Sequence, residues 1–276
     1  LTPTETNPRG WLGTHFNIDI TTKEGLEDFR SKMLKRVEMV IANMKAADAQ
    51  GEILWDITGA ASRRTHYDGE PDMRDSLAPE MLYKGEHERC IVYERFHRLD
   101  TAGLKHGVCL RPQKIVRHSD GGWTQKKIDD PGQRIYEEVK YCYERWGSRI
   151  YYMDSNIGKD NGSLMADDVM KKACTAFPDV IIAAEWQSTA YYRYSPPFDQ
   201  YWADWTAMTG RKVRMAWPNA FSIIVNGSSG HEQKTLEMHD QFLKAVKQGD
   251  IIMAPAWMEG SISYKDAIKL YQEAGK

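Results

Sequence analysis

The sequence lacks the patterns that mark several common functional classes. No run approaches about 18 consecutive apolar residues, which argues against a membrane-spanning helix. The 39 acidic and 37 basic side chains nearly cancel, so the chain lacks the strong positive field of a nucleic-acid-binding or polybasic membrane-binding protein. Neither a glycine-rich nucleotide loop nor an HExxH zinc motif occurs. We therefore expect no nucleic-acid partner, no membrane insertion, no metal and no cofactor.

Cysteine is also scarce. The four cysteines are Cys90, Cys109, Cys142 and Cys174, and no two of them form a CxxC pair. This spacing does not indicate a structural zinc site and does not dictate a disulfide pairing. We expect mostly reduced thiols that pack as small buried apolar groups.

The length of 276 residues suits one large domain, and no internal repeat or low-complexity segment divides the chain. We therefore expect a single domain over residues 1–276. The chain opens Leu-Thr-Pro-Thr-Glu without an initiator Met, which indicates a trimmed N-terminus and leaves export possible. Nothing in the sequence indicates the oligomeric state.

Short apolar runs alternate with segments of helical periodicity along the whole chain. The runs have continuous apolar centres, which are typical of parallel strands covered on both faces. The expected strands are 11–20, 52–59, 106–112, 149–155, 179–186, 212–218, 220–227 and 250–257. The expected helices are 22–49, 79–103, 131–147, 163–177, 232–248 and 263–274. This pattern predicts an α/β protein with a (β/α)8 TIM-barrel fold, with an open doubly wound sheet as the alternative and the assignment within 187–227 open.

Nearly every expected strand changes from apolar to polar or indole side chains at the same end. In a TIM barrel the carboxyl ends of the strands and the loops after them carry the catalytic residues. A purely structural barrel has no reason to collect such side chains on one rim. The residues so placed are His15, Asn17, Asp19, Asp56, Arg111, Gln113, Asp154, Asn156, Glu185, Trp186, Trp217, Trp257 and Glu259. We expect them to converge on a common mouth.

Two carboxylates end consecutive expected strands, Asp154 and Glu185. Neighbouring strands lie about 4.8 Å apart, so a carboxyl separation of about 5 Å, as in retaining glycosidases, is geometrically possible. Two carboxylates this close raise the pKa of one of them and keep it protonated near neutral pH. The pair predicts a glycoside hydrolase acting on an oligo- or polysaccharide, with Asp154 as nucleophile or stabilising carboxylate and Glu185 as general acid/base.

The other rim residues have the chemistry to hold a carbohydrate substrate through its hydroxyl groups and its C–H faces. The expected substrate-binding residues are His15, Asn17, Asp56, Arg111, Gln113, Asn156, Trp186, Trp217, Trp257 and Glu259. Arg111 is alternatively the ion partner that keeps Asp154 or Asp56 charged. The aromatic segment 186–205 forms either a sugar-stacking wall or the packing that a long excursion requires.

Several segments of the first two thirds of the chain resemble a bacterial group of glycoside-hydrolase-like TIM-barrel proteins. They are PRGWLGTHFNID, WDITG, GEPDM, LAPEM, GVCLRPQ, YYMDSN and AAEW, within residues 8–190. The resemblance implies the barrel fold without specifying an activity. Members of the group tend to carry an acidic residue where this chain has Thr58, so any role of that carboxylate is absent here.

The order of the two carboxylates is similar to a second group, the α-amylase-like hydrolases. In those enzymes an Asp on the fourth strand is the nucleophile and a Glu on the fifth is the acid/base. The other short motifs of that clan do not occur in this chain, so the likeness is an analogy between folds.

Two other functions use the same residues. A non-catalytic carbohydrate-binding barrel needs the aromatic rim but no paired carboxylates, and a carboxyl separation beyond about 10 Å favours it. A metal-dependent hydrolase or lyase would use His15, Asp19, Asp56 and Glu185, although no metal-binding spacing supports it. The sequence does not indicate the sugar, the linkage or the stereochemistry of the reaction.

Overall fold

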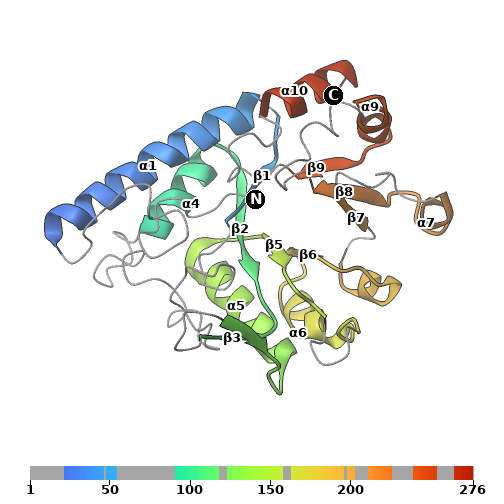
Figure 1. The fold of residues 1–276 in the computed structure, drawn as a ribbon, viewed down its shortest axis with the longest axis horizontal. Coiled ribbons are helices and arrows are strands. Elements are labelled where there is room, and N and C mark those ends of the chain that lie inside the picture. Colours follow the sequence, from blue (N-terminus) through green and yellow to red (C-terminus); the bar gives the residue numbers. More distant parts are fainter. Residues whose placement is uncertain are drawn as a thin grey trace.

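The computed structural model describes residues 22–46, 48–54, 91–117, 123–157, 163–195, 198–202, 211–225, 239–253 and 264–275. Strands and helices alternate through most of these segments (Figure 1). The helices are α1 (Lys23–Ala46), α4 (Ile91–Thr101), α5 (Pro131–Trp146), α6 (Asp168–Ala176), η4 (Thr189–Arg193, a 3₁₀ turn), α7 (Arg211–Ala216), α9 (His239–Lys247) and α10 (Tyr264–Glu273). The strands are β1 (Gly51–Leu54), β2 (Lys105–Leu110), β3 (Lys114–Arg117), β4 (Trp123–Lys126), β5 (Ile150–Met153), β6 (Ile181–Ala184), β7 (Phe198–Trp202), β8 (Phe221–Val225) and β9 (Ile251–Met253).

The sheet is parallel, apart from one hairpin. Among the described residues, strands pair in the orders β1-β2-β5-β6 and β7-β8-β9, all parallel, while β3 and β4 form an antiparallel hairpin after β2. Helices α1, α4, α5 and α6 form a row in which each contacts the next, α1 with α4, α4 with α5, and α5 with α6. The predicted α/β protein with a parallel sheet is confirmed.

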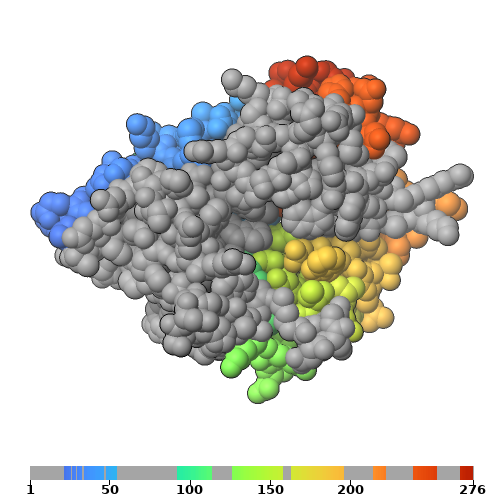
Figure 2. Space-filling view, viewed as in Figure 1, coloured from blue at the N-terminus to red at the C-terminus, as the bar shows by residue number. Residues whose placement is uncertain are grey.

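The two ends of the described chain meet. Helix α10 contacts both α9 and α1, so the last helix lies beside the first (Figure 1). In the space-filling view the surfaces of α1 and of α9 and α10 lie along the upper edge of the molecule (Figure 2). This neighbourhood of first and last helices is what helices ringing a closed cylinder of strands require.

The ends of α5 are determined by local sequence. Asp130 caps the first turn by accepting a 2.7 Å hydrogen bond from the Gln133 N–H, and Pro131 occupies a position where no N–H is needed. Gly147 ends the helix with φ 75°, a left-handed conformation that glycine adopts without steric cost. The predicted helix 131–147 is therefore confirmed almost to the residue.

The core lies between the β1-β2-β5-β6 sheet and the helices α1, α4, α5 and α6. Its fully buried members include Leu54, Phe96, Leu99, Val108, Leu110, Ile135, Val139, Cys142, Met153, Met170 and Ile182. Strand β2 approaches β5 so closely at Gly107 that a Cβ there would lie 1.4 Å from the carbonyl oxygen of Ile150. Glycine at this position therefore allows the pairing that aligns the ends of the two strands. None of the described helices has the length and apolar composition needed to cross a bilayer.

Several sequence-based boundaries were wrong. Residues 212–218 are not a strand, because 211–216 form helix α7. The strand that precedes β8 is instead β7, inside the segment predicted as an aromatic wall. Helix α6 begins at Asp168 and not at 163, because Leu164 forms an antiparallel bridge with Ile157. The expected strand 11–20 lies outside the described residues.

Candidate active site

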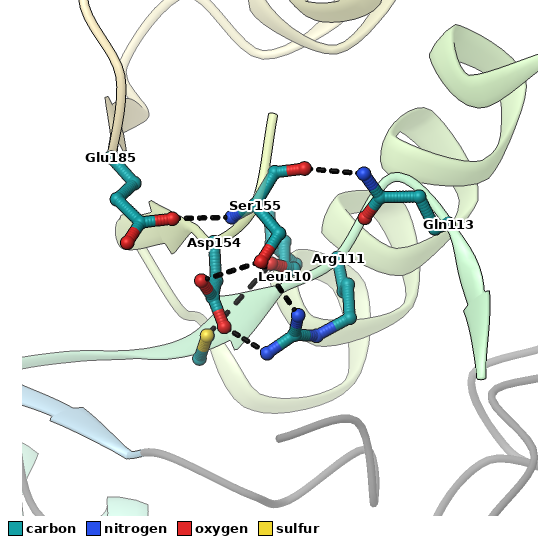
Figure 3. Close-up of polar contacts among 7 residues, drawn as sticks. Leu110, Arg111, Gln113, Asp154, Ser155 and Glu185 are labelled. Carbon is teal, nitrogen blue, oxygen red and sulfur yellow. Dashed lines mark hydrogen bonds and ion pairs between the residues drawn. The ribbon is translucent and has the colours of Figure 1, made fainter. Parts of the chain in front are cut away.

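Asp154 and Glu185 directly follow neighbouring parallel strands, β5 and β6. The ladder continues through both residues: the Asp154 N–H donates to the Leu110 carbonyl at 2.9 Å, and the Glu185 N–H donates to the Met153 carbonyl at 3.0 Å. The two carboxyl groups therefore start from adjacent positions at the carboxyl edge of the sheet (Figure 3). The predicted convergence of these two residues is observed.

Arg111 follows β2 and holds the Asp154 carboxylate. One guanidinium nitrogen, Nη2, donates to Asp154 Oδ2, and the other, Nη1, donates to the Ser155 hydroxyl oxygen at 2.8 Å (Figure 3). The Ser155 hydroxyl in turn donates to Asp154 Oδ1 at 3.1 Å. The side chains of Arg111 and Asp154 are only 3% and 9% exposed, so this is a buried ion pair. Of the two alternatives for Arg111, the ion partner of Asp154 is the one observed.

Glu185 has a different environment. Burial, as the largest cause, and the negative charge of the neighbouring Asp154 together raise the pKa of Glu185 to about 7. The Ser155 N–H, which donates to Glu185 Oε2 at 2.8 Å, and the positive charge of Arg111 oppose this shift. Near neutral pH a substantial fraction of Glu185 therefore carries a proton while the neighbouring Asp154 is ion-paired. In such a pair the ionised carboxylate can serve as the nucleophile, and the protonated carboxyl group beside it can serve as the proton donor.

Ser155 joins the two carboxyl groups and has an unusual backbone. Its φ of 57° lies in the left-handed region, which a residue with a Cβ rarely adopts. This conformation directs the Ser155 N–H to Glu185 and the hydroxyl to Asp154 and Arg111. Backbone strain of this kind is concentrated at functional sites, where surrounding contacts hold it.

We expect the Ser155→Gly variant to be more stable than Ser155→Ala by about 1 kcal/mol, because both lose the hydroxyl but only glycine adopts this φ without strain. Urea unfolding monitored by tryptophan fluorescence measures the difference. At an ordinary extended or helical position alanine is the more stable of the two, so an alanine variant as stable as the glycine variant would contradict the observed backbone.

Two amides predicted to bind substrate are buried and bond to groups of the protein itself. Asn156 is fully buried, and its side chain bonds to the main chain of Trp186 and to the Tyr191 hydroxyl. Gln113 is also buried, and its Nε2 donates to the carbonyls of Ser155 and Ile157. Both amides therefore fix the loop after β5, and substrate binding by them stays a prediction.

A buried ion pair on α5 contacts the main chain of Arg111. Arg134 Nε donates to the Arg111 carbonyl at 2.9 Å, and Arg134 Nη2 lies 2.9 Å from Glu138 Oε1. Burial raises the pKa of Glu138, and the charge of Arg134 opposes this shift. Sequence reasoning missed this pair and Ser155. One feature of the sequence could have indicated the buried pair. Arg134 and Glu138 are spaced i,i+4 and adjoin Ile135 and Val139 of the apolar face of α5.

The tryptophans at the predicted rim lie in different places. Trp186 follows Glu185 at the edge where β6 ends, and it is 41% exposed. Trp217 follows helix α7 and precedes β8, so it lies at the edge where that strand begins, with its ring 5.0 Å from that of Tyr192. Because the expected strand 212–218 is a helix, the reason for placing Trp217 beside the carboxylates no longer holds.

The remaining predicted site residues lie outside the described residues. They are His15, Asn17, Asp56, Trp257 and Glu259, together with Asp19, and Thr58 of the resemblance. Among the described residues, no cluster of three or more His, Cys, Asp or Glu side chains is placed to hold a metal ion. Substrate binding by these residues, and the metal-dependent alternative, stay predictions.

Parallel strands ringed by helices, with carboxylates at the strand ends, define a protein of the TIM-barrel type, and its structural neighbours are glycoside hydrolases. The maltogenic α-amylase AmyB from Thermotoga neapolitana matches with a TM-score of 0.56 at 9% identity, over 89% of this chain and 73% of that one. An α-amylase from Geobacillus thermoleovorans matches at 0.52 and 10% identity, over 98% of this chain and 74% of that one. α-L-Fucosidase isoenzyme 1 from Paenibacillus thiaminolyticus matches at 0.50 and 12% identity, over 87% of this chain and 62% of that one.

These likenesses establish the fold and nothing finer, because the identities are so low. The predicted TIM-barrel fold is confirmed. Neither a protein-family model nor a curated protein sequence matches the chain.

Proposed function

We propose that this protein is a glycoside hydrolase that acts on an oligo- or polysaccharide, with Asp154 as nucleophile and Glu185 as general acid/base. The observation that carries the proposal is the contrast between the two adjoining carboxyl groups. Asp154 is held in a buried ion pair by Arg111, whereas the pKa of Glu185 is raised to about 7 by burial and by Asp154. The glycosidase-like fold supports the proposal, because catalytic residues of TIM barrels lie at the carboxyl ends of the strands, and Asp154 and Glu185 directly follow β5 and β6.

The two steps of a retaining mechanism follow from these charge states. Protonated Glu185 donates its proton to the glycosidic oxygen while the Asp154 carboxylate attacks the anomeric carbon, and the leaving sugar departs as an alcohol. The resulting ester removes the negative charge of Asp154, so the pKa of Glu185 falls and the carboxylate can accept a proton from water. That water attacks the anomeric carbon and releases both the sugar and the Asp154 carboxylate.

Retention is the stereochemistry that the geometry favours. Inverting enzymes separate their carboxyl groups by about 6.5–9.5 Å to admit a water between them. Here Asp154 and Glu185 directly follow neighbouring paired strands, and the charge of Asp154 contributes to the raised pKa of Glu185, so the two groups adjoin. We therefore expect the first product to keep the anomeric configuration of the substrate.

A panel of glycans and aryl glycosides tests the proposal. We expect the wild-type protein to release sugar from at least one panel member, with retained configuration by ¹H NMR, and the Asp154→Asn variant to release none above background. Equal release by both proteins would disprove the assignment. Binding of a glycan by the wild type without any product would instead indicate the non-catalytic carbohydrate-binding barrel.

A further inference from the structure

After β5 the main chain leaves the sheet, and the Asn156 side chain takes over the hydrogen bonding to the chain that follows β6. The ladder between β5 and β6 ends in the Glu185 N–H bond to Met153, and Ser155 then turns the chain away with its φ of 57°. One residue further, the Asn156 amide reaches the main chain of Trp186. The Trp186 N–H donates to Asn156 Oδ1 at 2.9 Å, and Asn156 Nδ2 donates to the Trp186 carbonyl at 2.7 Å. The side-chain amide thus pairs with Trp186 as another peptide group would.

The Asn156 amide is itself held from behind. Its Nδ2 also donates to the Tyr191 hydroxyl oxygen at 3.1 Å, and the Tyr191 hydroxyl donates to the Met165 carbonyl at 2.7 Å. The Met165 N–H donates back to the Asn156 carbonyl at 3.0 Å, which closes a ring of hydrogen bonds. Asn156 and Tyr191 are both buried, so water does not compete for these bonds.

The consequence concerns Glu185, which lies between two fixed peptide groups. On one side its N–H is bonded to Met153, and on the other side the Trp186 peptide is gripped by Asn156. Its carboxyl group is fixed at a third point, by the Ser155 N–H. Loss of the Asn156 contacts frees one of the three anchors, and the Glu185 carboxyl can then move away from Asp154 toward water.

We propose that Asn156 is a positioning residue of the active site, which acts through Trp186 to hold the Glu185 carboxyl beside Asp154. The catalytic role of Asn156 rests on the proposed function, whereas the positioning of Glu185 by Asn156 does not. Asn156 is fully buried, so it acts on Glu185 through the Trp186 main chain. Only a short primary amide offers a donor and an acceptor at this reach, so neither Ala nor Asp can replace both bonds to Trp186.

The test compares Asn156→Ala with Tyr191→Phe, a matched variant that removes bonds behind the amide and leaves both Trp186 contacts in place. The readout is the titration of Glu185, followed by NMR of ¹³C-labelled glutamate carboxyls and assigned with the Glu185→Gln variant. In Asn156→Ala we expect the pKa of Glu185 to fall by about 1 or more toward its ordinary value, because burial and proximity to Asp154 both decrease. In Tyr191→Phe we expect it to remain near the wild-type value of about 7.

Turnover supplies the second readout. On a glycan identified by the panel, Asn156→Ala should lower kcat about a hundredfold with little change in KM, because the acid is displaced but substrate contacts remain. In the plot of its kcat against pH, the loss of activity at alkaline pH should begin at a lower pH than in the wild type, by the same shift as the pKa measured by NMR. An unchanged Glu185 titration in a folded Asn156→Ala variant would overturn the inference, even if glycosidase activity is found. If no glycan is hydrolysed, the titration still tests the positioning.

A measurement on the wild type guards against an Asn156→Ala variant that fails to fold. We expect the Trp186 amide proton to exchange with solvent as slowly as that of Glu185, although Trp186 has left the strand. Fast exchange of Trp186 beside a protected Glu185 would show that the Asn156 contact does not persist, and would also overturn the inference.

Discussion

Glu185→Gln is expected to lower kcat/KM about 10²–10⁴-fold on a natural glycoside, the range typical of losing a general acid/base. The amide keeps the size and an acceptor oxygen of the side chain, but its N–H protons are not acidic enough to be transferred to the leaving oxygen. The loss should be much smaller on an aryl glycoside such as a dinitrophenyl glycoside, whose leaving group departs without protonation. Steady-state kinetics on the two substrates measures this contrast.

Asp154→Asn is the matched control, because it changes the other carboxylate by the same single atom. Here the attacking group itself is lost, so activity should disappear on both natural and activated substrates. Added azide separates the two roles further. We expect it to restore turnover of Glu185→Gln with a product of retained configuration, and to give an inverted product, if any, with Asp154→Asn. Retained product from the Asp154→Asn variant would reverse the assignment of the two carboxylates.

The pH dependence of kcat/KM should follow the same charge states. Burial and Asp154 raise the pKa of Glu185 to about 7, and only the protonated form can act as acid in the first step. Activity should therefore fall as pH rises through about 7. In Glu185→Gln the alkaline limb should be lost, because no proton remains to dissociate there. A persistent limb near 7 in that variant would assign the titration to another group.

The main pair of carboxylates could be predicted from the sequence for a simple reason. Asp154 and Glu185 each end an uninterrupted apolar run, and such a run followed by a charge locates both a buried strand and its carboxyl end. Consecutive parallel strands of a barrel are neighbours, so their ends adjoin. The charge partner of Asp154 was accessible by the same argument, because Arg111 ends the strand on its other side.

The residues that fix this pair were not predictable in the same way. Ser155 matters through a backbone angle, and no residue pattern requires a positive φ at a serine. In α5, Arg134 and Glu138 look like an ordinary solvated i,i+4 pair, and only the packing of the helix turns them inward. The sequence shows that Asn156 comes just after β5, but its burial and its bonds depend on where Trp186 and Tyr191 lie.

The errors between 187 and 227 have a different cause. A short run such as 212–218 carries too few residues for its periodicity to separate strand from helix. Its Arg, Lys, Met and Ala residues have high helix propensity, and the chain forms α7 there. The true strand β7 has the sequence FDQYW, in which two polar residues interrupt the apolar run that marked the other strands.

Arg111→Leu should destabilise the fold by about 3–5 kcal/mol, the usual cost of removing one partner from a buried ion pair. The cost arises because the Asp154 carboxylate, 9% exposed, is left without its countercharge, and because the Ser155 hydroxyl loses a donor. Urea unfolding at pH 7 measures it.

The double variant Arg111→Leu/Asp154→Leu separates the lost charge balance from lost packing. Replacing both partners by apolar side chains leaves no buried charge, so the double variant should recover most of the stability that Arg111→Leu loses. Arg111→Lys keeps the charge but lacks the guanidinium group, whose two nitrogens reach Asp154 and Ser155. Its stability should lie between that of the wild type and that of Arg111→Leu, and its activity should be below that of the wild type. A double variant as unstable as Arg111→Leu would show that the guanidinium acts through packing, and the ion pair would then have no special part in keeping Asp154 charged beside a protonated Glu185.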